Sequence, residues 1–169
     1  ARAGVGTWAT HTVAPEKSLF KVGGSPDSAP IEALASLSAP AAAIQLIDNI
    51  SGLSEGDYII QNNAGSTVGQ AIMQYASSKG IKTINILRHR DDWEDFVNHL
   101  KDHGGDIVVS EEFARGADFA KLLADLPAPK AGFSSVGGSA TTSVARALAD
   151  GATLVSYGKM GRDPVYIPL

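Results

Sequence analysis

The chain contains no cysteine, which excludes disulfide bridges and thiolate metal sites and fits an intracellular or organellar enzyme. No apolar run approaches the length of about 18 residues that a membrane-spanning helix needs. Basic residues do not gather on one segment and the formal net charge is −4, which argues against a nucleic-acid-binding surface. No Gly-x-Ser-x-Gly motif occurs, so a serine hydrolase of the α/β-hydrolase type is excluded.

What remains is a globular composition: 169 residues, of which 44% are hydrophobic and 19% are charged. This is enough for one domain with a core. The start carries no initiator Met and no signal-peptide pattern, and the end follows closely on a predicted strand. We therefore expect a piece of a longer protein or a processed product. Residues 7–22 alternate enough to predict a strand or hairpin, and residues 30–50 predict a helix that is broken or restarted at Pro40.

From residue 58 onward, short apolar runs alternate with segments of helical periodicity. Strands that are apolar on both faces and separated by helices indicate a parallel sheet covered on both sides. The fold class predicted is therefore α/β, a doubly wound sheet of the Rossmann type. The predicted strands are 58–61, 82–87, 106–109, 130–135 and 152–157, and the predicted helices are 68–78, 91–102, one within 113–126, and 140–149.

A turn of small residues joins the first of these strands to the helix that follows it. Strand, glycine turn and helix in that order form a phosphate cradle, because the helix N-terminus offers free N–H groups and a partial positive charge to an anion. The alternative is a tight turn that binds nothing. The candidate cofactor-binding residues here are Gly65, Ser66, Thr67, Val68 and Gly69.

The next strand ends in Arg88-His89-Arg90, where an NAD-preferring domain would place an acid to bind the ribose hydroxyls. A pair of guanidinium groups suits a 2′-phosphate instead, since it offers charge and bidentate geometry. This predicts NADPH as the cofactor. The alternative is two solvated arginines, balanced by the acids that follow: Asp91, Asp92 and Glu94. The first two of these acids are also predicted to supply the cap and first turn of the next helix.

Two further patterns are interpreted as structural. Tyr75-x-x-x-Lys79 matches the catalytic pair of short-chain dehydrogenases but stands too close to the glycine turn, so we expect Tyr75 to pack and Lys79 to face the helix C-terminus. His99 and His103 have a spacing that can hold a metal, but no third ligand stands in position. No metal site is predicted.

Two glycine-containing segments lie just past the carboxyl ends of the last two predicted strands, where ligands sit in open α/β sheets. They are Val136-Gly137-Gly138 and Ser156-Tyr157-Gly158-Lys159-Met160. Glycine at these places permits a ligand to approach the backbone. A simple exit from strand to loop explains them almost equally well.

Taken together, a set of motifs resembles the mitochondrial trans-2-enoyl-thioester reductases, which are zinc-free medium-chain dehydrogenase/reductase proteins. The motifs are Gly6-Thr7-Trp8, Gly56-Asp57, Gln61-Asn62, Val68-Gly69-Gln70, Thr83-Ile84-Asn85, Arg88-x-Arg90, Val136-Gly137-Gly138 and Tyr157-Gly158-x-Met160. The resemblance runs through nearly the whole chain. It implies NADPH-dependent reduction of the C2=C3 bond of an enoyl thioester in fatty acid synthesis, with hydride delivered to C3 and a proton to C2. It also implies an acyl carrier protein or CoA thioester as substrate, the mitochondrial matrix as location, and a homodimer in the full-length form.

The resemblance also assigns roles to residues. It places Gly65, Ser66, Thr67 and Val68 at the diphosphate and Arg88, His89 and Arg90 at the 2′-phosphate. It places Tyr157, Gly158, Lys159 and Met160 near the nicotinamide. Residues 1–23 are expected to be the return segment of a GroES-like catalytic domain, and residues 24–169 the dinucleotide-binding domain.

Three departures from the family limit what we expect of the chain. The family's catalytic tyrosine belongs to the GroES-like domain, so no catalytic residue is assigned here. The family's Asn and Thr at the start of the first long helix are replaced by Ala39 and Ala42. The segment that completes the family's sheet and substrate pocket is not found before Leu169. The chain alone is therefore expected to reduce enoyl thioesters poorly. A degenerate reductase-like structural or interaction subunit, and a quinone oxidoreductase of the same superfamily, remain as alternatives.

Overall fold

The computed structural model of the chain describes three stretches: residues 9–19, 31–161 and 163–167. The chain divides into two compact units, residues 1–35 and residues 36–169. No helix among the described residues is long and apolar enough to cross a membrane.

The described part of the first unit contains a short 3-10 helix, η1 (Glu16–Ser18), and most of helix α1 (Ile31–Ser36). The strand or hairpin predicted for residues 7–22 is wrong where it can be judged, because residues 9–19 contain no strand. Pro15 stands at the N-cap of the 3-10 helix, and proline has no N–H to contribute to a sheet. The remaining residues of that prediction lie outside the described stretches.

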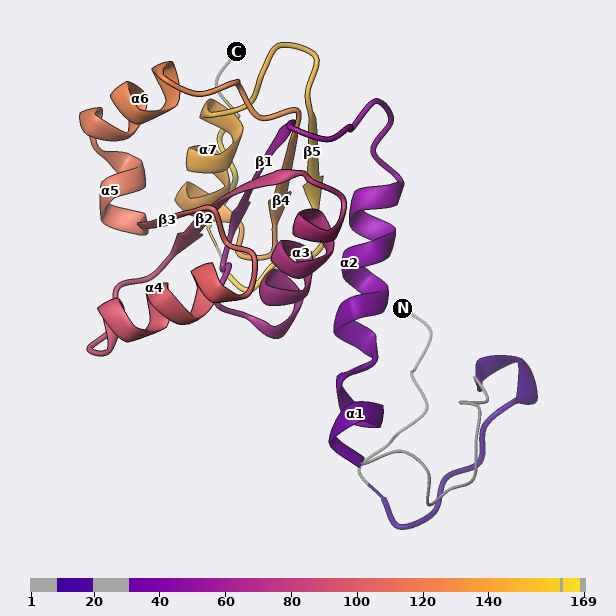
Figure 1. Cartoon of the computed structure of the whole chain (residues 1–169). Helices are drawn as coiled ribbons and strands as arrows, with labels where there is room; N and C mark the ends of the chain where they lie inside the picture. The colour runs from indigo at the N-terminus through magenta and orange to yellow at the C-terminus, as the bar shows by residue number, and fades with distance from the viewer. Residues whose placement is uncertain (1–8, 20–30, 162, 168–169) are drawn as a thin grey trace. The chain divides into compact units, whose positions relative to one another are not determined.

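The second unit is built on one parallel sheet, and this confirms the predicted fold class. Its strand order is β3-β2-β1-β4-β5, and every neighbouring pair is parallel (Figure 1). The predicted strands agree with the observed ones to within two residues at each end. The observed strands are β1 (Tyr58–Asn62), β2 (Lys82–Leu87), β3 (Ile107–Ser110), β4 (Ala131–Ser134) and β5 (Thr153–Ser156).

The helices of this unit depart from prediction at three places. The helix predicted for residues 140–149 begins at Gly138 and ends at Arg146. The break expected at Pro40 falls at Leu37. Pro40 lies in the first turn of the next helix, where backbone N–H groups have no acceptor within the helix, so the missing N–H of proline costs no hydrogen bond. The single helix expected within residues 113–126 is two helices divided at Gly116. The helices are α2 (Ser38–Asp48), α3 (Thr67–Ser78), α4 (Trp93–Asp102), α5 (Glu111–Arg115), α6 (Ala117–Ala124) and α7 (Gly138–Arg146).

Each face of the sheet carries its own hydrophobic core. On one face, Ile59 and Phe133 pack with residues of α2 and α3, including Ile47 and Ile72. On the other face, Ile60, Ile84 and Ile86 pack with residues of α5, α6 and α7. Figure 1 shows these two layers of helices on opposite sides of the strands. The neighbouring residues Ile59 and Ile60 of β1 thus face opposite cores, which explains why apolar residues follow one another directly in the strand.

The strand order creates a switch point between β1 and β4, where the connections of the chain leave toward opposite sides of the sheet. Buried polar side chains join the two strands there. Asn62 donates to Ser134 Oγ (2.8 Å) and accepts from the backbone N–H of Ser135 (3.1 Å). The Ser134 hydroxyl in turn meets the hydroxyl of Thr141 on α7 at 2.6 Å. This network fixes the carboxyl ends of β1 and β4, where ligands bind in sheets of this kind.

Candidate functional site

The turn from β1 into α3 is held in shape by its own residues. Asn63 has a positive φ of 53°, a conformation that asparagine tolerates better than most residues. Ser66 is the N-cap of α3, and its hydroxyl accepts from the Gly69 N–H (3.1 Å). Gln70 donates its side-chain amide to the Gly65 carbonyl (2.9 Å). The turn is therefore formed before any ligand arrives.

This turn presents N–H groups that no other described residue uses. The backbone N–H groups of Gly65, Thr67 and Val68 find no acceptor among the described stretches of the chain. Because α3 runs for 12 residues behind them, its dipole adds partial positive charge at the same place. Unsatisfied donors at the start of a helix are the arrangement that binds a phosphate group.

Gly69 is required for a reason other than approach of a ligand. A Cβ atom built on this residue would lie 2.6 Å from the carbonyl oxygen of Ala64. The Gly69 carbonyl also accepts from Gln61 Nε2 (3.0 Å), which donates as well to Asn85 Oδ1 (2.8 Å). Gly69 thus lets the first turn of α3 sit directly on the glycine turn. Its predicted contact with cofactor stays a prediction.

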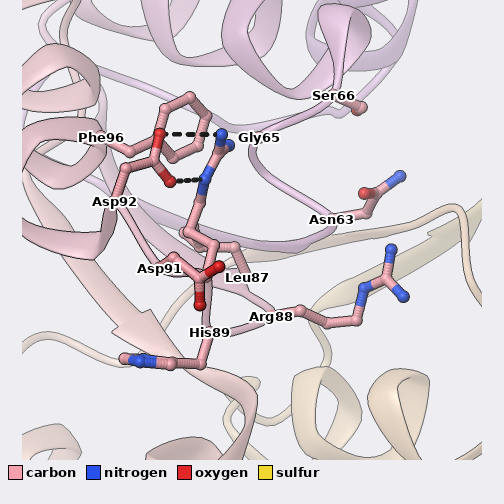
Figure 2. Close-up of a pocket in the computed structure, with 10 residues that line it drawn as sticks. Asn63, Gly65, Ser66, Leu87, Arg88, His89, Asp91, Asp92 and Phe96 are labelled. Carbon is pink, nitrogen blue, oxygen red and sulfur yellow. Dashed lines mark hydrogen bonds and ion pairs between the residues drawn. The ribbon is translucent and has the colours of Figure 1, made fainter.

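A cleft of about 620 Å³ opens between this turn and the carboxyl end of β2. It brings together most of the residues that the sequence assigned to the phosphate groups of a dinucleotide. The lining residues, drawn in Figure 2, are Asn63, Gly65, Ser66, Leu87, Arg88, His89, Arg90, Asp91, Asp92 and Phe96. Two residues of the predicted cradle, Gly65 and Ser66, therefore share one space with the predicted 2′-phosphate residues, whereas Thr67, Val68 and Gly69 do not line it.

Within this cleft the two arginines have different neighbours. Arg90 forms an ion pair with Asp92, and its guanidinium lies 3.9 Å from the ring centroid of Phe96. Arg88 extends toward Asn63 and has no hydrogen-bond or ion-pair partner among the described residues. Asp91 and Asp92 were expected to supply the cap and first turn of α4, but the helix begins at Trp93. Asp92 stands at the N-cap without a capping hydrogen bond, and its carboxylate binds Arg90 instead. That bond holds the pKa of Asp92 below its ordinary value.

A second cleft, of about 420 Å³, continues past the carboxyl ends of β4 and β5. It shares Asn63 and Arg88 with the first cleft. The two glycine-containing segments predicted from sequence meet here, where the Met160 N–H donates to the Ser135 carbonyl (3.2 Å). The other lining residues are Glu111, Arg115, Val136, Gly137, Gly138, Ser139, Ala140, Met160, Gly161 and Asp163.

Some of the predicted cofactor residues do not line either cleft. Tyr157 packs against the core beside α2 and α3. Burial raises the pKa of its phenol, and Ser135 faces it and opposes that rise, although the two hydroxyls do not meet with hydrogen-bond geometry. Gly158 lies against the backbone of Ser135, where a Cβ would come within 2.8 Å of the carbonyl oxygen. Lys159 is exposed.

The two patterns interpreted as structural have structural partners. Tyr75 donates to Asp48 on α2 (2.9 Å), and Lys79 pairs with the same carboxylate (2.9 Å) rather than with the end of its own helix. These contacts hold the pKa of Asp48 below its ordinary value. His103 Nδ1 lies 2.7 Å from the His99 carbonyl oxygen.

Asn63 and Phe96 are among the cleft residues to which the sequence assigned no role. Asn63 lines both clefts, and its amide donates to Ser135 Oγ (3.1 Å). An asparagine just before a small-residue turn signals a left-handed backbone, and this signal could have identified it. Phe96 was not singled out, because an aromatic residue on an amphipathic helix is most simply read as core.

Comparison with known proteins gives a consistent result. No protein-family model matches the chain. The mitochondrial enoyl-acyl-carrier-protein reductase of Dictyostelium discoideum is 47% identical over 164 residues, covering 96% of this chain and 46% of the relative. The chain therefore spans about half the length of the curated relatives it matches.

Solved structures agree with the sequence comparison. The mitochondrial 2-enoyl thioester reductase heterodimer Etr1p/Etr2p from Candida tropicalis has a TM-score of 0.76 at 26% identity, over 86% of this chain and 42% of that one. A complex of Etr1p with NADP and crotonyl-CoA has a TM-score of 0.76 at 26% identity, over 85% and 41%. The resemblance drawn from sequence motifs is confirmed by these relatives.

Proposed function

We propose that this chain, a relative of the mitochondrial enoyl-acyl-carrier-protein reductases over about half of their length, is the NADPH-binding part of a 2-enoyl-thioester reductase. The observation that carries the proposal is the single cleft shared by the glycine turn and the end of β2. It offers unused N–H groups at one side and cationic side chains at the other. Such a pairing suits a ligand with a diphosphate and a further phosphate on its ribose.

The residues fit NADPH better than NADH. Arg88 follows the last residue of β2, at the position where an acidic side chain would bind the ribose hydroxyls of NADH. Its guanidinium is exposed and free of partners among the described residues, so it can bind a 2′-phosphate without giving up another contact. We assign Arg88, His89 and Arg90 to the 2′-phosphate, and Gly65, Ser66, Thr67 and Val68 to the diphosphate.

The nicotinamide end is assigned to the second cleft, because it continues from the first past β4 and β5. Tyr157, Gly158, Lys159 and Met160 are placed near that end, and Met160 lines the cleft. NADPH bound there would supply the hydride for C3 of the enoyl thioester. The proton at C2 needs a donor for which this chain offers no assigned residue.

The rest of the assignment rests on the relatives. We propose an enoyl thioester of acyl carrier protein or CoA as substrate, the mitochondrial matrix as location and a homodimer as the assembly of the full-length protein. Residues 1–23 are proposed as the return segment of a GroES-like domain, with residues 24–169 as the cofactor domain. A crotonyl-CoA complex and a heterodimer are on record for the Etr1p relatives.

A second candidate is a catalytically degenerate subunit with a structural or interaction role. It is favoured by the start of α2, where the family's polar pair is replaced by Ala39, which is buried, and Ala42. No side chain at these two positions can hold a nicotinamide by hydrogen bonds.

A fluorescence titration of the 169-residue chain with NADPH, with NADH as the matched ligand, separates these functions. The proposed function predicts saturable binding with a preference for NADPH. Absence of binding by either nucleotide would remove the cofactor assignment and favour the degenerate subunit. Equal binding of both would remove the role given to the arginines.

A further inference from the structure

We propose that Phe96 is a positioning residue that holds the Arg90 guanidinium in the cleft and so contributes to the preference for a 2′-phosphorylated cofactor. The proposal rests on the NADPH function argued above. It concerns a side chain on α4 that belongs to neither the glycine turn nor the basic segment after β2.

An aromatic ring and a carboxylate both contact the guanidinium of Arg90. Its guanidinium carbon lies 3.9 Å from the centroid of the Phe96 ring, which is the geometry of a cation–π contact. Asp92 binds Arg90 along one edge, through Nε and through Nη2 at 3.0 Å. A guanidinium has five N–H donors, so the two on Nη1 and the second on Nη2 remain available. These form a second edge that can bind a phosphate in bidentate fashion.

The ring of Phe96 also lies against Gly65 of the glycine turn. A Cβ atom built on Gly65 would lie 3.0 Å from Cε1 and 3.2 Å from Cζ of the ring. The ring thus touches the glycine turn and also supports Arg90. Figure 2 shows Phe96 and Gly65 together at one side of the cleft. Phe96 therefore sets the separation between the proposed diphosphate site and the Arg90 side chain.

Arg90 and Arg88 differ in how far their side chains are ordered by neighbouring residues. Both arginines are exposed long side chains, and such a side chain loses rotamer entropy when a ligand orders it. Arg90 is already ordered by a ring and a carboxylate, whereas Arg88 has neither. Ordering in advance reduces the entropic cost of binding. A flat aromatic face at residue 96 achieves this, and an aliphatic side chain of similar size does not.

The test compares Phe96→Leu with Phe96→Tyr, which keeps the aromatic face. Phe113→Leu is the matched control, because Phe113 is also a partly exposed ring but packs edge-on against Phe119. The first readout needs no cofactor: the Arg90 Nε–H signal in an NMR spectrum, assigned by its loss in Arg90→Lys. A ring over the guanidinium shifts that signal upfield. Phe96→Leu should abolish the upfield shift, whereas Phe96→Tyr and Phe113→Leu should retain it.

The second readout is the ratio of the dissociation constants for NADH and NADPH. Phe96→Leu should lower this ratio about two- to fivefold, the size of an exposed cation–π contact. In an Arg90→Ala background the same substitution should leave the ratio unchanged, since its effect is exerted through Arg90. Loss of folding would lower affinity for both nucleotides together and leave the ratio intact.

The outcomes are distinguishable from failure of the proposed function. If the unmodified chain prefers NADPH but Phe96→Leu keeps the full ratio, the role of Phe96 is overturned and the proposed function stands. If the unmodified chain binds NADPH and NADH equally well, the proposed NADPH function itself is overturned, and the role of Phe96 falls with it. An unchanged Arg90 signal in Phe96→Leu overturns the proposal whatever the nucleotides do.

Discussion

At the scale of single residues, Arg88 carries the cofactor assignment, because its guanidinium lines the cleft and has no competing partner among the described residues. Arg88→Ala should weaken NADPH binding about tenfold, the value of a charge-assisted hydrogen bond, and leave NADH binding nearly unchanged. Both affinities can be measured by the titration described above. Arg146→Ala, an exposed arginine in the last turn of α7, serves as control. An equal loss for both nucleotides would contradict the assignment.

The difference between Arg88 and Arg90 could not be predicted from the sequence. Arg88 and Arg90 both follow the end of a predicted strand and are separated by one residue, so the sequence does not distinguish them. Both were therefore assigned to the 2′-phosphate. What separates them is a ring on α4, six residues beyond Arg90, and a carboxylate two residues beyond it. Such contacts depend on how α4 packs against the end of β2, which no local pattern encodes.

Gly69 provides a second prediction at this scale. A Cβ on Gly69 would meet three backbone atoms of Ala64 at 2.6–2.8 Å, and backbone cannot move aside as a side chain can. Gly69→Ala should lower the free energy of unfolding by about 1–3 kcal/mol, as overpacking of a well-packed region does. Urea denaturation measures this.

The control for that experiment is Gly116→Ala. Gly116 has a φ of −85°, which any residue adopts, and a Cβ there would meet nothing closer than 3.4 Å. Its free energy of unfolding should change by less than about 1 kcal/mol. Equal losses in the two variants would show that the close approach at Gly69 does not matter.

At the scale of elements, the strands were predicted well and the helices less so. Strand positions could be predicted from short apolar runs, because a strand of a sheet that is covered on both faces buries both sets of its side chains. The break between α1 and α2 was placed three residues too late, because the helix was expected to break or restart at Pro40 itself, whereas this proline stands inside the first turn of α2. The split at Gly116 follows from local hydrogen bonds, since the Ser110 hydroxyl caps α5 and Gly116 closes it.

The amino ends of β1 and β4 are joined by an ion pair with a pH-dependent contribution. Asp57 accepts from Lys130 (2.9 Å) and from the N–H of Ser54 (2.9 Å), and these contacts lower the pKa of Asp57. A carboxyl whose pKa is lowered by folding stabilises the native state above its unfolded pKa of about 4. That contribution is lost as the pH falls through the lowered value.

Asp57→Asn should therefore reduce the melting temperature at neutral pH, and the difference from the unmodified chain should shrink in acid, below about pH 4. Melting curves over a pH series at constant ionic strength test this. Lys130→Met removes the partner of Asp57. In that background, the difference in melting temperature that Asp57→Asn causes between neutral and acid pH should be smaller. A difference that stays constant from neutral pH into acid would mean that the Asp57 charge does not contribute.

At the scale of the whole molecule, the fold and the general position of the site followed from the alternation of strands and helices. Phe96 was left without a role, because its part depends on a contact between α4 and the segment after β2, whereas Asn63 carried a local signal that was not used. The predictions for residues 1–8 and 20–23 lie outside the described residues. The division into cofactor and catalytic parts stays a prediction.

The chain is expected to bind NADPH but not to oxidise it when 2-enoyl-CoA is added. The physical reason is that no side chain assigned here can deliver the proton to C2, and Ala39 and Ala42 cannot orient the nicotinamide through hydrogen bonds. Loss of nicotinamide absorbance in the presence of substrate measures turnover. Steady turnover by the 169-residue chain would show that its own residues complete the chemistry.

The central claim is that the cleft between the glycine turn and β2 binds a nucleotide through its 2′-phosphate. Competition against bound NADPH by two ligands that differ only in that group, adenosine 2′,5′-bisphosphate and adenosine 5′-monophosphate, tests it most directly. The bisphosphate is expected to displace NADPH at a concentration about tenfold lower than the monophosphate, as one added charge-assisted contact implies. Equal displacement by the two ligands would contradict it.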